Sequence, residues 1–356
     1  AISIIPVNTE NKSNVAGRKN GLDMLRVFAI MMVITVHFII AQGYYANPIA
    51  GKKYYFASMA RWLAQTCCPI FMILSGYFLS RMKTGKKHFK SIIKFLRNYF
   101  VIVVIFVIYH KKYDMEAIKQ LVNLNYMWYV NMYFGLLLIS PYINQIIDQW
   151  DQYSKAVKTI LCFFILASFG TITHEWFSNY WFGLYPILYY FIGAFFRKFE
   201  IKNIGKVSCF SIILILLMLQ AAYTLFSGYG EKFDWVRNMG GYSCAYNATP
   251  TLICTVCLFQ FFKDISLENK RINKVLEIIS KQSLEIYLLV CMFVGDWVYQ
   301  PLFEVVFVRY GVVYFWMVIV IVEIIIGTVL GWILNFALNN ICGLIHRGCM
   351  KNCDFI

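Results

Sequence analysis

Two polar side chains, Arg26 and His37, interrupt the hydrophobic stretch GLDMLRVFAIMMVITVHF at residues 21–38. Eleven residues of an α-helix rise about 16 Å and turn through about 1100°, or about three turns and 20°. Both side chains therefore lie on one face of the expected helix, one above the other. A guanidinium binds phosphates and carboxylates, and an imidazole moves protons near neutral pH. The spacing indicates anion binding and proton transfer along one polar stripe.

Each of these residues also has a simpler interpretation. Arg26 alone can extend to the lipid headgroups, and His37 alone can be a packing histidine. A charge in mid-span costs about 2.5–3.5 kcal/mol, so such residues usually face a cavity or a partner. The shared face therefore favours function. Asp23 is about 21 Å below His37 by helical rise, and at i,i+3 we expect it to pair with Arg26.

The composition places these residues in a membrane protein. Of the 356 residues, 60% are hydrophobic and 14% are charged, with a mean hydropathy of +0.60, which excludes a soluble domain. Residues 1–20 lack an apolar core for a cleavable signal peptide, so the first span is expected to direct insertion. The net charge of +15 reflects orientation in the bilayer, and we expect no nucleic-acid partner.

The eleven cysteines are interpreted as structural. Most of them lie in apolar runs, where cysteine is usually a small buried hydrophobic residue. Cys349 and Cys353 lack other ligands at a zinc-binding spacing. We expect no metal site and no tightly bound cofactor. The cysteines placed in apolar runs include Cys67, Cys68, Cys162, Cys254, Cys257 and Cys291.

Hydropathy predicts an all-α, polytopic fold with about ten membrane-spanning helices. With the N-terminus inside, 23 of the 33 Lys and Arg residues fall in inner segments and 9 in outer ones, so both termini are expected in the cytoplasm. The expected domains are a cytoplasmic segment 1–20, a transmembrane domain 21–340 and a cytoplasmic tail 341–356. The spans are 22–41, 58–79, 92–110, 126–147, 157–172, 181–196, 207–227, 242–262, 282–302 and 312–337.

Three further ionisable residues lie in or beside these spans. Lys94 and Arg97 are at i and i+3 near the inner end of the third span, where they serve either as positive-inside anchors or as phosphate ligands. Glu323 lies deep in the tenth span, where a carboxyl group is either protonated or paired with a base. Arg26 and His37 are its possible partners.

Six stretches, taken together, resemble the acyltransferase-3 family of bacterial membrane proteins. The first is the Asp23, Arg26 and His37 pattern. Lys94 stands where the family commonly has an arginine, and Leu289 or Val290 where many relatives have a histidine. The other stretches are PIFMILSGYFLSR (69–81), KSIIKFLRNYF (90–100), YMWYVNMYFGLLLISPYIN (126–144), YPILYYFIGAFFRK (185–198) and ISKQSLEIYLLVCMF (279–293).

The resemblance implies an O-acyltransferase, with acetyl transfer as the first expectation. The motifs do not identify the acceptor glycan. Family members transfer an acetyl or other short acyl group from cytoplasmic acyl-CoA to a hydroxyl of a cell-surface or lipid-linked sugar. His37 would be the general base, with Arg26 and Glu323 at the catalytic centre. Arg26, Lys94 and Arg97 would bind the acetyl-CoA donor in the cell membrane. The residues expected at the acceptor side or along a channel are Trp128, Tyr129, Tyr133, Ser75 and Tyr77.

Several alternatives stay open at this stage. Ten spans and an intramembrane glutamate also fit a transporter, for example of amino acids, or a polysaccharide exporter. Trp128 either stacks on a sugar or belongs to an interfacial aromatic belt. Ser75, beside Gly76, is interpreted as a small residue that permits close helix contact and not as a nucleophile. Direct transfer and an acyl-enzyme are both compatible with the sequence. The sequence also leaves the oligomeric state open.

Overall fold

The structure, a computed structural model of the whole chain, is almost entirely helical where it is described. One short antiparallel pairing joins β1 (Ile4–Pro6) to β2 (Phe199–Ile201). The predicted all-α class is therefore confirmed. The described residues are 4–6, 20–41, 52–111, 115, 116, 119, 127–173, 179–201, 205–227, 245–293 and 312–353.

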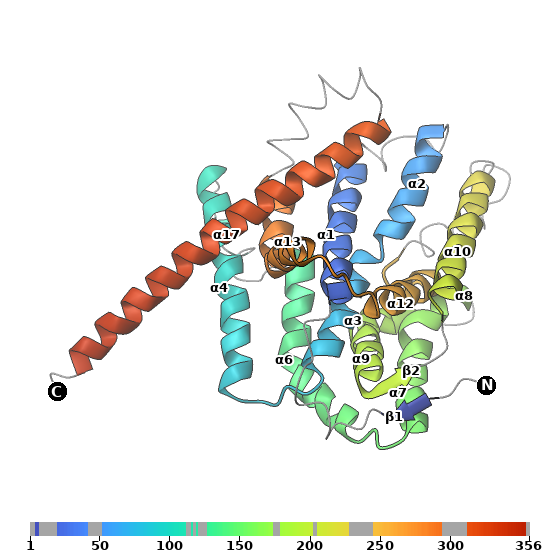
Figure 1. Cartoon of the computed structure of the whole chain (residues 1–356), viewed down its shortest axis with the longest axis horizontal. Helices are drawn as coiled ribbons and strands as arrows, with labels where there is room; N and C mark the ends of the chain where they lie inside the picture. The colour runs from blue at the N-terminus through green and yellow to red at the C-terminus, as the bar shows by residue number, and fades with distance from the viewer. Residues whose placement is uncertain are drawn as a thin grey trace.

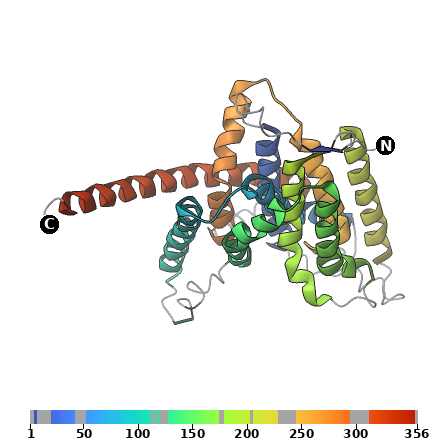
Figure 2. The ribbon, with the colours of Figure 1, turned by 90° about the horizontal axis from the view of Figure 1, so that it is seen from below.

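The helices form a bundle around α1, and one long helix, α17, crosses it and projects well beyond it (Figures 1 and 2). In Figure 1, α4 and α10 lie toward opposite sides of the bundle. The elements are α1 (Asn20–Ala41), α2 (Lys52–Ala64), α3 (Cys67–Leu79), α4 (Lys86–Tyr109), α6 (Trp128–Asp148), α7 (Tyr153–Phe164), the π-helical turn η1 (Ile165–Phe169), α8 (Gly170–Thr173), the 3₁₀ helix η2 (Asn179–Leu184), α9 (Tyr185–Lys198), α10 (Lys206–Ser227), α12 (Thr249–Lys263), α13 (Lys270–Lys281), α14 (Ser283–Leu289) and α17 (Val312–Cys353).

Within the described residues, seven helical segments are long and apolar enough to cross a membrane. Three other predicted spans coincide with shorter helices, namely α9, α12 and the apolar segment Ser283–Phe293. Residues 126, 242–244 and 294–302 of the predicted spans lie outside the described residues. The count of ten spans and the cytoplasmic termini stay predictions. The seven segments are Asn20–Ile40, Ser58–Leu79, Lys86–Tyr109, Trp128–Asp148, Tyr153–Ile172, Lys206–Tyr223 and Trp316–Asn340.

Helix α4 shows how these helices meet lipid. One of its faces is buried and includes Phe95 and Tyr99, yet Ile93 and Ile108 on the opposite side are more than half exposed. From Tyr99 to Tyr109, α4 is apolar on all sides although only one side is packed, and such a helix needs an apolar surrounding. The exposed isoleucines are therefore the lipid-facing side of the bundle.

Glycines bring α3 and α9 into backbone contact. A Cβ added to Gly76 would overlap the carbonyl oxygen of Tyr190, and one added to Gly193 would overlap that of Ile73. Small residues permit this approach between membrane helices. The predicted role of the Ser75–Gly76 pair in close helix contact is confirmed for Gly76. The contact holds α3, which forms one wall of the site described below.

Helix α13 is an amphipathic helix within the segment that hydropathy assigned to an inner loop. It begins at Asn269, whose side chain accepts hydrogen bonds from the backbone N–H groups of Arg271 and Ile272, as an N-cap does. Val275 on its apolar side is exposed. Its basic and apolar faces suit a helix that lies in the membrane interface.

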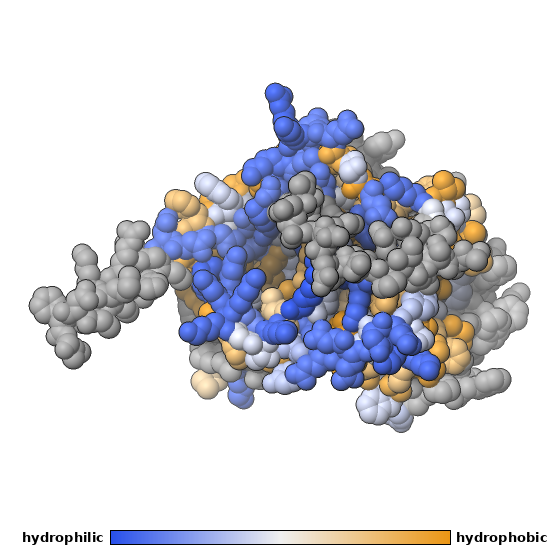
Figure 3. All heavy atoms as spheres, turned by 60° about the horizontal axis from the view of Figure 1, so that its bottom comes forward, coloured by the Kyte–Doolittle hydropathy of each residue, from blue (hydrophilic) through white to orange (hydrophobic). Residues whose placement is uncertain are grey.

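Hydrophilic side chains gather on the face reached by turning the bottom of Figure 1 forward, where they surround a hollow with hydrophobic side chains in it (Figure 3). The link between α3 and α4, together with the first turn of α4, carries the exposed basic residues Arg81, Lys83, Lys86 and Lys87. The distribution of Lys and Arg predicts that this link lies in the cytoplasm.

We expect Gly76→Ala to lower the free energy of unfolding by about 1–3 kcal/mol, because the added methyl group overlaps the Tyr190 carbonyl and forces a backbone shift. Thermal unfolding of purified protein in detergent measures the effect. Gly135→Ala on α6 is the matched control, since its added Cβ meets open space. Equal stability of the two variants would contradict this account of the α3–α9 contact.

The orientation is tested by inserting a protease site between Lys83 and Thr84, or between Tyr180 and Trp181. The first site should be cut in inverted vesicles only and the second in right-side-out vesicles only, because positive loops stay inside. Cleavage of both sites from the same side would refute the predicted alternation.

Candidate functional site

The site is built on two helical segments that run parallel and in step. Arg26 of α1 hydrogen-bonds Ser280 at the end of α13, and His37 of α1 contacts Cys291 in the segment after α14. Both pairs are separated by 254 positions. The partner segment therefore advances eleven residues where α1 advances eleven. Arg26 and His37 both face it, as their spacing predicted.

Arg26 is held in place by a short chain of polar contacts. Its Nη1 donates to Ser280 Oγ at 2.8 Å, and Ser280 Oγ donates to Asp23 Oδ1 at 2.7 Å. Arg26 Nη1 and Asp23 Oδ1 are 3.8 Å apart, which confirms the predicted i,i+3 pairing. The guanidinium also lies 5.5 Å from the centre of the Phe78 ring, within cation–π range.

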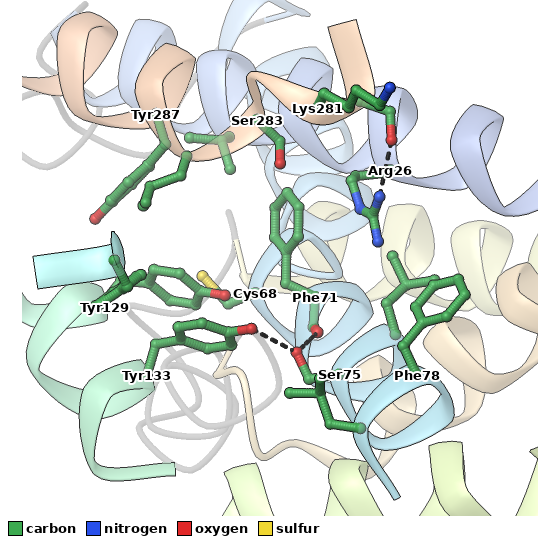
Figure 4. Close-up of a pocket in the computed structure, with 16 residues that line it drawn as sticks. Arg26, Cys68, Phe71, Ser75, Phe78, Tyr129, Tyr133, Lys281, Ser283 and Tyr287 are labelled. Atoms are coloured by element: carbon green, nitrogen blue, oxygen red, sulfur yellow. Dashed lines mark hydrogen bonds between the residues drawn. The ribbon is translucent and has the colours of Figure 1, made fainter. Parts of the chain in front are cut away.

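Arg26 lines a cavity of about 390 Å³ enclosed by α1, α3, α4, α6 and the α13–α14 segment (Figure 4). Lys281 contributes a second cation, although its Nζ also lies 2.6 Å from Glu277 Oε1. The other walls are mainly apolar and aromatic. Residues that carry polar groups to the wall are Arg26, Lys281, Ser280, Ser283, Ser75, Cys68, Tyr129, Tyr133 and Tyr287.

Three of the residues expected along a channel line this cavity: Ser75, Tyr129 and Tyr133. The tyrosine rings stack on each other, with centroids 5.8 Å apart and an angle of 15° between planes. Ser75 Oγ donates to the carbonyl oxygen of Phe71 at 2.8 Å and lies 2.9 Å from Tyr133 Oη. Because the serine proton is used on Phe71, the Tyr133 hydroxyl is the donor in the second bond.

The other two expected lining residues lie elsewhere. Trp128 is 48% exposed and packs against Tyr246, with ring centroids 5.1 Å apart. Tyr77 is buried under the guanidinium of Arg197, which lies 5.2 Å from its ring centre. Neither side chain belongs to the wall of the Arg26 cavity.

Lys94 and Arg97 flank Phe95, which does line the cavity, but they are not part of its wall. Lys94 is exposed. Arg97 Nη2 donates to Asn98 Oδ1 at 2.9 Å, and Asn98 Nδ2 donates to Glu285 Oε1 at 2.6 Å. Glu285, which is 3% exposed, also accepts from Asn335 of α17 at 2.8 Å. Arg97 thus belongs to a polar network that joins α4, α14 and α17.

A second, more polar cavity of about 800 Å³ is lined by Ser80 and other residues that do not line the first. Its wall includes basic side chains at the ends of α3 and α9. Lys198 donates from Nζ to the carbonyl oxygen of Ile147 at 2.8 Å. Burial lowers the pKa of Lys198, because desolvation disfavours the ammonium form. The basic residues in this wall are Arg81, Lys83, Arg197 and Lys198.

His37 meets a thiol. Its Nε2 lies 3.0 Å from Cys291 Sγ, a hydrogen-bonding distance whose donor depends on the histidine tautomer. Glu323 of α17 is 1% exposed and lies close enough to Cys291 to interact with it electrostatically. The same thiol thus neighbours both residues. Within the described residues, no group of three or more His, Cys, Asp or Glu side chains is arranged to hold a metal ion.

Four residues of this region were not predicted from the sequence: Ser280, Lys281, Glu285 and Cys291. All four lie in or beside the stretch ISKQSLEIYLLVCMF. Glu285 was detectable, because an acid in an apolar span is costly. The partners of Ser280 and Cys291 depend on how two helices pack, and one helix's sequence does not give that. Treating Cys291 as a packing residue overlooked its contact with His37.

Comparison with known proteins supplies the family. Residues 19–338 match the model of the acyltransferase domain of the acyltransferase-3 family. No curated protein and no solved structure matches the chain significantly. The matched residues begin just before α1 and end in α17, so they include every site residue described above. The chain therefore belongs to the acyltransferase-3 family of membrane acyltransferases.

Proposed function

We propose that the chain is a multi-pass O-acyltransferase of the cell membrane. It transfers an acyl group, acetyl foremost, from cytoplasmic acyl-CoA to a hydroxyl of a cell-surface or lipid-linked sugar. Family membership supports acyl transfer. The finer proposal rests on one observation: α1 carries a cation at an open cavity and an imidazole about 16 Å further along the same face.

The donor's phosphates bind near Arg26. A guanidinium binds phosphate through paired charge-assisted hydrogen bonds, which are about twice as strong as neutral ones. Asp23 and Ser280 orient this guanidinium, and Lys281 adds charge to the same wall. Lys94 and Arg97, which flank Phe95 in the sequence, attract the donor from outside the cavity. The acyl end points along α1 toward His37.

His37 removes the proton from the attacking sugar hydroxyl. The oxygen then forms a bond to the acyl carbon, the bond from that carbon to the coenzyme A sulfur breaks, and the thiolate takes up the proton. Glu323, buried close to Cys291, which contacts His37, stabilises the imidazolium while it carries the proton. A neutral histidine suits this task because its ordinary pKa lies near the pH of the medium.

The acceptor approaches through aromatic surroundings. Tyr129 and Tyr133 present stacked rings to the cavity, and Trp128 next to them presents an exposed indole. Aromatic faces are suited to packing against the apolar faces of sugar rings. Ser75 positions this surface through its bond to Tyr133.

His37→Gln should lower the rate of acyl transfer by about 100- to 10,000-fold, because the general base is lost. The assay supplies radiolabelled acetyl-CoA to membranes from expressing cells and measures label in the extracted glycan. His110→Ala is the histidine control, since His110 packs against Phe106 at the end of α4. Persistent substrate uptake without acyl transfer in wild-type protein would favour a transporter and refute the proposal.

Arg26→Ala should raise the KM for acetyl-CoA by about 10- to 100-fold, since one hydrogen bond to a charged group contributes about 1.5–3 kcal/mol. Arg26→Lys should recover part of this loss, because it keeps the charge and loses the planar fork. Lys87→Ala, at an exposed position in the first turn of α4, controls for the loss of a positive charge. An unchanged KM in Arg26→Ala would place the donor elsewhere.

A further inference from the structure

The contact between His37 and Cys291 brings a nucleophile to a base. Nucleophilic cysteines are activated by a neighbouring histidine within hydrogen-bond reach, and the distance from Sγ to Nε2 is 3.0 Å. Among the seven cysteines that the structure describes, Cys291 is the one in hydrogen-bond contact with a histidine. Packing alone does not explain why a thiol faces the polar edge of an imidazole.

The thiol lies near the wall of the Arg26 cavity, although Cys291 and His37 are not themselves part of that wall. Tyr287 lines that cavity, and Cys291 follows it by four residues on the same segment. Cys68, another residue of the cavity wall, lies close enough to Cys291 to interact with it electrostatically. An extended thioester whose phosphates are bound at Arg26 therefore points its acyl end toward Cys291.

The backbone at Cys291 departs from a regular α-helix. Residues 290–293 form a π-helical turn directly after α14. Such turns are rare and occur frequently at functional sites, where the wider turn re-aims side chains. Cys291 itself is partly exposed within the bundle, whereas its neighbours Val290 and Met292 are buried.

We propose that Cys291 is the acyl-carrying nucleophile of this enzyme. The inference rests on the proposed acyl transfer and replaces the direct attack of the sugar on acyl-CoA by two successive transfers. His37 takes the thiol proton as Cys291 Sγ attacks the acyl carbon of acyl-CoA. The bond from that carbon to the coenzyme A sulfur breaks, coenzyme A leaves with the proton from His37, and an S-acyl cysteine remains.

The second half of the reaction uses the same pair of residues. His37 takes the proton of the acceptor hydroxyl, whose oxygen attacks the acyl carbon, and Cys291 leaves and recovers that proton. In each half of the reaction, the proton moves to His37 as the nucleophile attacks the acyl carbon. Two exchanges at one thiol allow the coenzyme A to leave before the sugar binds.

The test traps the intermediate. Full-length protein in detergent is mixed with radiolabelled acetyl-CoA without any acceptor, quenched in acid, digested and analysed by mass spectrometry. We expect one acetyl group on the peptide that carries Cys291, released by neutral hydroxylamine as a thioester is. Cys291→Ala should lose this label and lower transfer to glycan by about 1,000-fold or more, as removal of a covalent nucleophile does.

Two further variants make the result specific. Cys254→Ala removes another buried cysteine, in α12, and should leave the label and the transfer rate unchanged. Cys291→Ser keeps the size of the side chain. Any acetyl group that this variant takes up should form an oxygen ester, which resists neutral hydroxylamine. Size-exclusion profiles identical to that of wild type show that the variants are folded.

The outcomes distinguish a failure of the acyl-cysteine proposal from a failure of acyl transfer itself. Glycan transfer by Cys291→Ala at the wild-type rate, with no label on the wild-type peptide, overturns the role of Cys291 and leaves acyl transfer with His37 intact. Absence of both label and glycan transfer in the wild-type protein overturns acyl transfer from acetyl-CoA and the acyl-cysteine together.

Discussion

The register between α1 and the α13–α14 segment governs the whole site. At one end, Ser280 joins Asp23 to Arg26, and at the other, His37 meets Cys291. A shift of one residue along either helix would rotate its side chains by about 100° relative to the partner. The cation and the imidazole would then no longer face the same neighbour. The hydrogen bonds at Ser280 therefore fix the geometry about 16 Å away at His37.

Close backbone packing complements this polar register. The Gly76 and Gly193 contact holds α3 against α9, and Ser75, next to Gly76, thereby faces the cavity at a fixed position. Its hydroxyl accepts from Tyr133 because its own proton is used on Phe71. Gly76 thus provides the contact with α9, and Ser75 beside it provides a polar group to the cavity wall.

Sequence reasoning succeeded where a single helix contains the answer. The common face of Arg26 and His37 and the Asp23–Arg26 pair follow from helical geometry alone. It does not reach what depends on packing between helices. The structure places Lys94 and Arg97, the expected donor ligands, outside the wall of the Arg26 cavity, and the sequence of α4 alone does not indicate this. Hydropathy also does not predict the π-helical turn at 290–293, because the composition of this turn is that of an ordinary span. It does not predict the amphipathic α13 either, because the average hydropathy of α13 is that of a loop.

Helix α17 contributes to the site although it is far from α1 in the sequence. It packs against both α1 and α14, where Trp316 donates to Thr35 and Asn335 donates to Glu285, and it brings Glu323 to the thiol beside His37. During synthesis, the ribosome releases α1 long before α17. His37 and Cys291 are therefore made before Glu323, which reaches them only when α17 has inserted and packed against α1 and α14. The order of insertion thus decides when the surroundings of His37 and Cys291 are complete.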